Sequence, residues 1–235
     1  MEQAQEESTA TVPVIYTDVF KTINTYHRHM AIKLLTQVTT KSLVGKSHWW
    51  GAPDLPEGVP YPTVEVSDGD ETYAEPLTFL GQIRCNELAP FDTEHLLPQE
   101  GMLWFFAPLD YFLGEADSPL DYHMPPRVIY SRQTEGLRPY DLHWEGTDES
   151  IFRPAEKIVF TVADQSSGDG LMMLCTPYQD EVLSQHSGDV CLLQVDEDDR
   201  WGLRFYDCGM YYIFIPARNL SCRHFDKATG ELFYY

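Results

Sequence analysis

The sequence predicts an α+β fold dominated by antiparallel β-strands, with few short helices and long ordered loops. Runs of β-branched and aromatic residues are frequent, whereas helical periodicity is rare. An internal similarity also predicts two similar strand-loop-strand units within this fold. No linker divides the chain. We therefore expect a flexible leader at residues 1–12, which has few apolar anchors, followed by a single domain at 13–235.

The predicted strands are short apolar runs bounded by Gly, Pro, Asp or Asn. In chain order they are residues 32–38, 77–85, 102–107, 127–131, 157–162, 191–195, 203–206 and 211–215. Two short helices are predicted, one capped by Asp18 and running through Tyr26, the other running from Pro177 through Leu183. The connections at 51–76, 108–126 and 133–156 are rich in proline and acidic residues and are expected to be loops.

The internal similarity relates two segments that each carry a glutamine. The stretch Leu80-Gly81-Gln82-Ile83 aligns with Leu192-Leu193-Gln194-Val195, and a Gly-Met pair begins the next strand in both segments. The two-residue period of a strand places Gln82 on the same face as Leu80, and Gln194 on the same face as Leu192. If these faces are inward, each amide either fixes a neighbouring loop backbone or offers hydrogen bonds to an extended peptide. We favour the first interpretation because buried side-chain amides most often bind backbone groups.

Composition and charge exclude several classes of protein. With 43% hydrophobic and 13% aromatic residues, the chain is not a disordered protein. No apolar run approaches the ~18 residues of a membrane-spanning helix. The 37 Asp and Glu outnumber the 16 Lys and Arg, giving a net charge of −21, so nucleic-acid binding is not expected and a basic protein or peptide is the favoured partner.

The N-terminus and the cysteines predict a cytoplasmic location. The first residues contain acids and no apolar stretch, unlike a secretory signal. The five cysteines form an odd set without a C-x-x-C pair, which is typical of a reducing compartment.

Several blocks of sequence occur in a characteristic order. They are GAPDLP at 51–56, PLTFLGQIRCNEL at 76–88, LPQEGMLWFFA at 97–107, LLQVDEDD at 192–199 and YDCGMYYIFIPARNL at 206–220. In this order they resemble the YwqG-like family of bacterial proteins, whose pattern is S-K-x-G-G-x-P-x-L-P, F-x-A-Q-I, G-x-L-x-F-F and L-L-Q-I-D-S-D before W-G-D-A-G. Trp50 replaces the first glycine of that pattern, and Tyr206-Asp207-Cys208-Gly209 replaces its last turn.

The resemblance implies protein binding rather than catalysis. The YwqG-like family is a domain family of unknown biochemical function. It is distantly similar to the programmed cell death protein 2 group, whose members escort a basic ribosomal protein. Its bacterial members also occur near polymorphic toxins, where immunity proteins are common. We therefore expect a non-enzymatic, acidic binding module of the escort or immunity type.

The candidate binding residues are acidic, amide and indole side chains. An acidic run follows the predicted strand at 191–195 and is expected to form a turn at the edge of a negative pocket; its spacing lacks the glycine and glutamate of an EF-hand calcium loop. The adjacent Trp49 and Trp50 either cover one end of the core or form an aromatic platform. The full candidate set is Trp49, Trp50, Gln82, Gln194, Asp196, Asp198, Asp199 and Asp207.

Two alternatives stay open at this stage. One is a hydrolase that uses a metal or paired carboxylates, since His27, His29, Cys222 and His224 have the i, i+2 spacing of metal ligands on strands. The other is a small-ligand binder built on Trp49 and Trp50. The sequence has no G-x-S-x-G elbow, P-loop or G-x-G-x-x-G, so we assign no catalytic residue and expect no metal or cofactor. The oligomeric state is left open.

Overall fold

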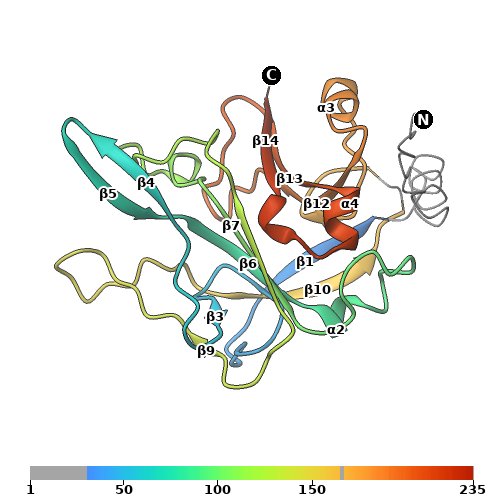
Figure 1. Ribbon diagram of the computed structural model, residues 1–235, viewed down its shortest axis with the longest axis horizontal. Coiled ribbons are helices and arrows are strands. Elements are labelled where there is room, and N and C mark those ends of the chain that lie inside the picture. The colour runs from blue at the N-terminus through green and yellow to red at the C-terminus, as the bar shows by residue number, and fades with distance from the viewer. Residues whose placement is uncertain (1–30, 165–166, 235) are drawn as a thin grey trace, which may run out of the picture.

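A computed structural model describes residues 31–164 and 167–234. It shows a protein built around one ten-stranded antiparallel sheet (Figure 1). The strand order is β14-β13-β12-β11-β1-β10-β2-β6-β7-β8. The bounds of these strands, in chain order, are β1 Ile32–Val38, β2 His48–Trp49, β6 Thr78–Arg84, β7 Met102–Ala107, β8 Arg127–Ser131, β10 Glu156–Val162, β11 Met172–Met173, β12 Asp189–Asp196, β13 Gly209–Pro216 and β14 Thr229–Tyr234.

The sheet curls into a half-barrel, which brings its two outer strands towards each other. The ring of Tyr130 on β8 lies 5.6 Å from that of Phe225 in the 3₁₀ helix η2 (Phe225–Lys227), which immediately precedes β14. Gly230 on β14 lies against Tyr211 and Pro126, and a Cβ at this position would collide with the Tyr211 hydroxyl. Glycine at 230 therefore permits the close approach that the curl requires.

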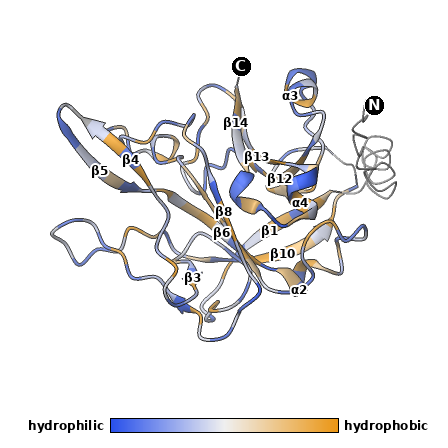
Figure 2. Cartoon of the chain, viewed as in Figure 1, coloured by the Kyte–Doolittle hydropathy of each residue, from blue (hydrophilic) through white to orange (hydrophobic). Residues whose placement is uncertain are grey.

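The core lies on both faces of the sheet at β7 and β12, because these two strands are apolar along most of their length. All six residues of β7 are buried, as are six of the eight residues of β12. One large cluster fills the concave interior, and a second forms around Trp104 and Phe106. Figure 2 shows hydrophobic residues along β6 and β10 and hydrophilic residues at the tip of the β4–β5 hairpin. Such continuous apolar runs are typical of strands covered on both faces.

The remaining elements are short. Two small sheets pair β3 (Asp54–Leu55) with β9 (Arg138–Pro139), and β4 (Thr63–Asp68) with β5 (Glu71–Pro76). The helices are α2 (Cys85–Leu88), η1 (Tyr111–Leu113), α3 (Asp180–Gln185) and α4 (Ala217–Ser221). Mostly antiparallel β-structure with few short helices agrees with the predicted fold class. Within the described part of the chain, no helix is long and apolar enough to cross a membrane.

The structure differs from the predicted elements at several places. Residues 203–206 are not a strand: they close a tight turn in which Leu203 forms an isolated bridge with Asp198. Residues 63–76, expected to be loop, form the β4–β5 hairpin, and β14 was not predicted. The predicted helix near Pro177 is α3, which begins at Asp180. The leader at 1–12 and the helix predicted after Asp18 lie outside the described residues.

Candidate functional site

Gln82 is buried and hydrogen-bonded on every side. Its Oε1 accepts from the Asp54 backbone N–H at 2.8 Å and from the Trp104 indole N–H at 3.1 Å. Its Nε2 donates to the Lys46 carbonyl at 3.0 Å and to Asp54 Oδ2 at 2.6 Å. Asp54 Oδ2 also accepts from the Gly45 N–H at 2.7 Å. The amide thus holds the loop around β2 against β6, and it presents no free donor or acceptor to a partner.

Gln194 has the corresponding position on β12. It is fully buried, and its Nε2 donates to the Gly168 carbonyl at 2.8 Å and to the Gly170 carbonyl at 2.9 Å. Cys175 Sγ lies 3.5 Å from Gln194 Oε1. Each glutamine therefore fixes the loop that precedes its neighbouring strand, β2 for Gln82 and β11 for Gln194.

Trp49 and Trp50 lie in the core, where they pack with Trp201. The three ring centroids are 5.3 to 5.8 Å apart, and the side chains of Trp49 and Trp50 have exposed fractions of only 1% and 2%. The Arg153 guanidinium lies 5.7 Å from the Trp50 ring and donates to the Trp201 carbonyl at 2.7 Å. Neither Trp49 nor Trp50 offers an exposed ring face, so an aromatic platform at these residues is wrong, and the pair covers the core.

The acidic run forms a compact turn after β12, and its carboxylates bind groups within the turn and the adjoining loops. Asp196 accepts from the Gly170 N–H at 2.7 Å, and Glu197 accepts from the Phe205 N–H at 2.7 Å. Burial raises the pKa of the Asp196 carboxyl more than its backbone hydrogen bonds lower it. These two carboxylates shape the turn.

The other two carboxylates of the run pair with arginine side chains. Asp198 makes a bidentate contact with Arg200, at 3.0 Å for Nε and 2.6 Å for Nη2, and Asp199 pairs with Arg204. Burial tends to raise the pKa of the Asp198 carboxyl, but its hydrogen bonds with Arg200 and the charge of that residue together lower it. Asp207, at the far end of the same connection, is exposed.

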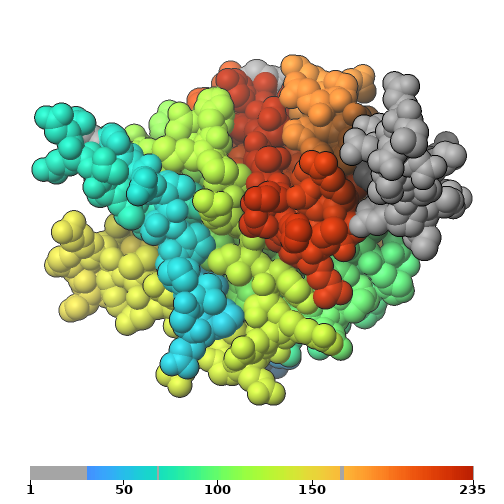
Figure 3. Space-filling model, in the orientation of Figure 1, coloured from blue at the N-terminus to red at the C-terminus, as the bar shows by residue number. Residues whose placement is uncertain are grey.

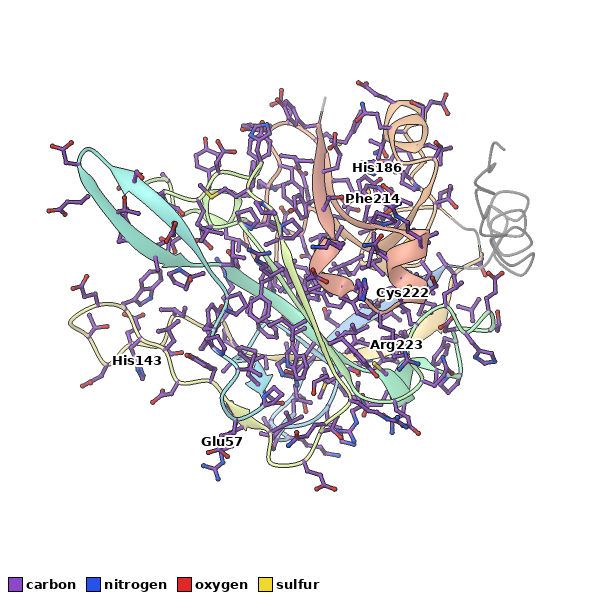
Figure 4. All side chains as sticks on the ribbon, in the orientation of Figure 1. Glu57, His143, His186, Phe214, Cys222 and Arg223 are labelled. Carbon is purple, nitrogen blue, oxygen red and sulfur yellow. The ribbon has the colours of Figure 1, made fainter. Side chains whose placement is uncertain are left out.

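The described histidines and cysteines do not assemble a metal centre. Cys222 is exposed after α4 (Figure 4), and His224 is exposed two residues later, while His27 and His29 lie outside the described residues. His186 stacks on Phe214 with ring centroids 3.8 Å apart, and its Nδ1 lies 2.9 Å from Asp189 Oδ2 (Figure 4). Between residues 31–164 and 167–234, no group of three or more His, Cys, Asp or Glu is arranged to hold a metal ion.

The structure brings together four tyrosines that the sequence analysis did not single out. Tyr111, Tyr122, Tyr206 and Tyr234 form what we call the tyrosine patch. The ring centroid of Tyr206 lies 4.6 Å from that of Tyr234, 6.4 Å from that of Tyr122 and 6.5 Å from that of Tyr111. The neighbouring Tyr234 hydroxyl, followed by burial and the Tyr206 hydroxyl, raises the pKa of Tyr122 to about 12. Asp207 is the one predicted candidate next to this patch in the chain. The three segments that carry these tyrosines are far apart in the sequence, so no local pattern indicates the patch.

The comparison with protein families shows which family the chain belongs to. A model described as a domain of unknown function, DUF1963, matches residues 47–167 and 161–232. The chain belongs to this family. The matched region includes both glutamines, the three tryptophans and the acidic turn. A search of curated proteins found no match to this chain.

Proposed function

We propose that this DUF1963 protein is a non-enzymatic binding module that captures a basic protein or peptide, as an escort or an immunity-type neutraliser does. The observation that carries the proposal is the concentration of acidic residues on two projecting segments. We call these segments, the β4–β5 hairpin at 63–76 and the loop at 141–149, the acidic arms. They contain nine carboxylates and no Lys or Arg.

Both arms extend away from the sheet. The teal β4–β5 hairpin and the yellow loop project on the left of the view, and the space-filling view shows them standing clear of the body (Figures 1 and 3). Glu65, Asp70 and Glu71 on the hairpin are exposed, as are Asp141, Glu145, Asp148 and Glu149 on the loop. Their negative charge attracts a basic partner and accelerates its capture.

Three further features of the chain support its resemblance to the YwqG-like family, its two similar units and a cytoplasmic location. The ordered blocks that resemble the YwqG-like family fall within the region matched by DUF1963. The register of β6 shifts at Leu80 and that of β12 at Leu192, which supports two similar strand-loop-strand units within one domain at 13–235. All five cysteines are free thiols, which favours a cytoplasmic location.

Binding of a fluorescent lysine nonapeptide tests the acidic arms. The arm variant Glu65→Gln, Asp70→Asn, Glu71→Gln removes three exposed charges. The control variant Glu100→Gln, Glu181→Gln, Asp226→Asn removes the same number elsewhere; Glu100 and Asp226 already pair with Arg132 and Lys227. We expect the arm variant to bind about tenfold more weakly at low salt and the control to bind within about twofold of the wild type. Equal losses in both variants would mean that only net charge matters, which contradicts the role of the arms.

A further inference from the structure

The tyrosine patch is exposed although it is aromatic. The exposed fractions are 50% for Tyr111, 48% for Tyr206 and 45% for Tyr234. Tyr111 belongs to η1, Tyr122 to the connection before β8, Tyr206 to the turn before β13, and Tyr234 ends β14. In Figures 1 and 3 the green segment that contains η1 adjoins the red C-terminal strand at the top of the view. Exposed aromatic clusters of this kind mark interaction sites.

The Phe112 ring and two hydrogen bonds from arginine residues hold the patch in place. The ring of Phe112 packs against both Tyr206 and Tyr122, at centroid distances of 5.3 and 5.7 Å. The Arg204 N–H donates to the Phe112 carbonyl at 3.0 Å, which ties the turn that carries Tyr206 to η1. Arg153 donates to the Leu113 carbonyl at 3.0 Å. The tyrosine rings are thus arranged in advance of binding, which lowers the conformational entropy that a complex loses.

The surroundings of the patch are acidic. The three segments that carry it, 108–126, 205–208 and 229–234, contain six carboxylates and no Lys or Arg. Glu115, Asp117, Asp121 and Asp207 are exposed. Two arginines adjoin these segments in the chain, Arg127 and Arg204, and Arg204 pairs with Glu197 and Asp199. A ligand at the patch therefore meets aromatic faces and hydroxyl oxygens within a negative field.

We propose that the tyrosine patch binds arginine side chains of an extended basic segment in the partner. Aromatic faces attract a guanidinium by cation–π interaction and stacking. Phenol and carboxylate oxygens accept its five N–H groups, which an apolar or acidic peptide cannot supply. The inference rests on the proposed function, because it assigns the docking site and the preferred side chain of the same basic partner.

The patch is expected to distinguish arginine from lysine. Both carry one positive charge, so the acidic arms attract them equally over long distances. Arginine is planar, more weakly hydrated and able to stack on a ring, whereas the lysine ammonium is a compact and strongly hydrated charge. A preference for arginine at equal peptide charge is therefore specific to aromatic contacts.

Fluorescence anisotropy with three labelled probes tests the proposal on the full chain: an arginine, a lysine and an uncharged proline nonapeptide. The patch variant is Tyr111→Ser combined with Tyr234→Ser. Tyr178→Ser is the matched control, because Tyr178 is 45% exposed, precedes α3 and belongs neither to the patch nor to the acidic arms. Far-ultraviolet circular dichroism and an unfolding curve establish that each variant is folded.

We expect the wild type and Tyr178→Ser to bind the arginine peptide about tenfold more tightly than the lysine peptide, and the patch variant to lose most of this difference. If the wild type binds both basic peptides equally, or if the patch variant keeps the preference for arginine, the assignment of arginine binding to the tyrosine patch is overturned. Either result would leave the role of the acidic arms supported. Failure of both basic peptides to bind would overturn the proposed function as well. Equally tight binding of the proline peptide would assign the patch to a proline-rich partner and overturn the proposal. Self-association that only the patch variant abolishes would assign the patch to a second copy of this chain and would also overturn it.

Discussion

Replacing Gln82 by leucine is expected to destabilise the protein strongly, because four buried groups lose their partner. Leucine has a similar size but makes none of the bonds to the Asp54 N–H, the Trp104 indole, the Lys46 carbonyl and the Asp54 carboxylate. Three neutral hydrogen bonds are worth about 1 kcal/mol each and one to a carboxylate about 2 kcal/mol. The free energy of unfolding should therefore fall by about 5 kcal/mol.

Gln194→Leu is the matched control for this change. It occupies the corresponding strand position and is equally buried, but it loses only two carbonyl bonds and one weak contact with the Cys175 thiol. The expected loss is about 2 to 3 kcal/mol. Urea unfolding followed by circular dichroism measures both losses, provided that the dependence on urea, m, is unchanged.

A third variant, Gln82→Glu, tests the geometry independently. It replaces Nε2 by an oxygen that faces Asp54 Oδ2, 2.6 Å from the original nitrogen. Two carboxylates at this distance cannot both ionise, so the variant should lose stability relative to the wild type as the pH rises. A loss below about 1 kcal/mol for Gln82→Leu, or losses equal to those of Gln194→Leu, would refute the reasoning from the hydrogen-bond network.

Three further predictions concern the rest of the fold. Gly101→Ala should lower the free energy of unfolding in urea by about 3 kcal/mol or more, because φ is +93° and a Cβ would collide with the Ser131 carbonyl. Gly114→Ala, with φ +102° and open space around the Cβ, should lower it by only about 1 kcal/mol. Equal losses in the two variants would contradict this prediction. Burial raises the native pKa of Asp110 above 3.8, so the stability that its protonated form contributes is complete below pH 3.8 and lost as the pH rises through the native pKa. Asp110→Asn should therefore gain stability relative to the wild type over that pH interval. A stability difference that does not change with pH would refute this prediction. Ellman's reagent should modify two thiols rapidly in the native protein and all five in denaturant, and rapid modification of a third native thiol would contradict the burial of Cys85, Cys175 and Cys191.

The main sheet was largely predictable because its strands bury one or both faces. Runs such as those of β7 and β13 are apolar over their whole length, and alternation on β1 indicated a strand as well. Two-residue periodicity predicted that Gln82 shares a face with Leu80, and Gln194 with Leu192, and this was wrong because the register shifts at each of these leucines. Leu80 and Leu192 belong to the largest core cluster, whereas Gln82 bonds to Trp104 and Gln194 contacts Cys175, which belong to the other two clusters. The hydrogen-bond partners of the two glutamines were not predictable, because Lys46, Asp54 and Gly168 reach them only through the folding of separate loops.

The elements that were missed lack a hydrophobic signal. The β4–β5 hairpin is exposed along most of β5, so its pattern resembles a polar loop, although Asp68-Gly69 at its tip is typical of a hairpin turn. Residues 203–206 alternate as a strand does, yet the hydrogen bonds between Asp198 and Leu203 close a turn there. The tyrosine patch gathers residues from three segments that are distant in the sequence, and only the folding of the sheet brings them together.

Affinity capture from the native lysate is the decisive experiment on whether this chain is an acidic binding module. The wild type, the arm variant and the control variant are immobilised, and retained proteins are identified by mass spectrometry at low and high salt. We expect the wild type and the control to retain one basic protein at low salt, high salt to release it, and the arm variant to retain far less. Capture of no basic protein by the folded wild type at any salt concentration would contradict the claim that this chain is an acidic binding module.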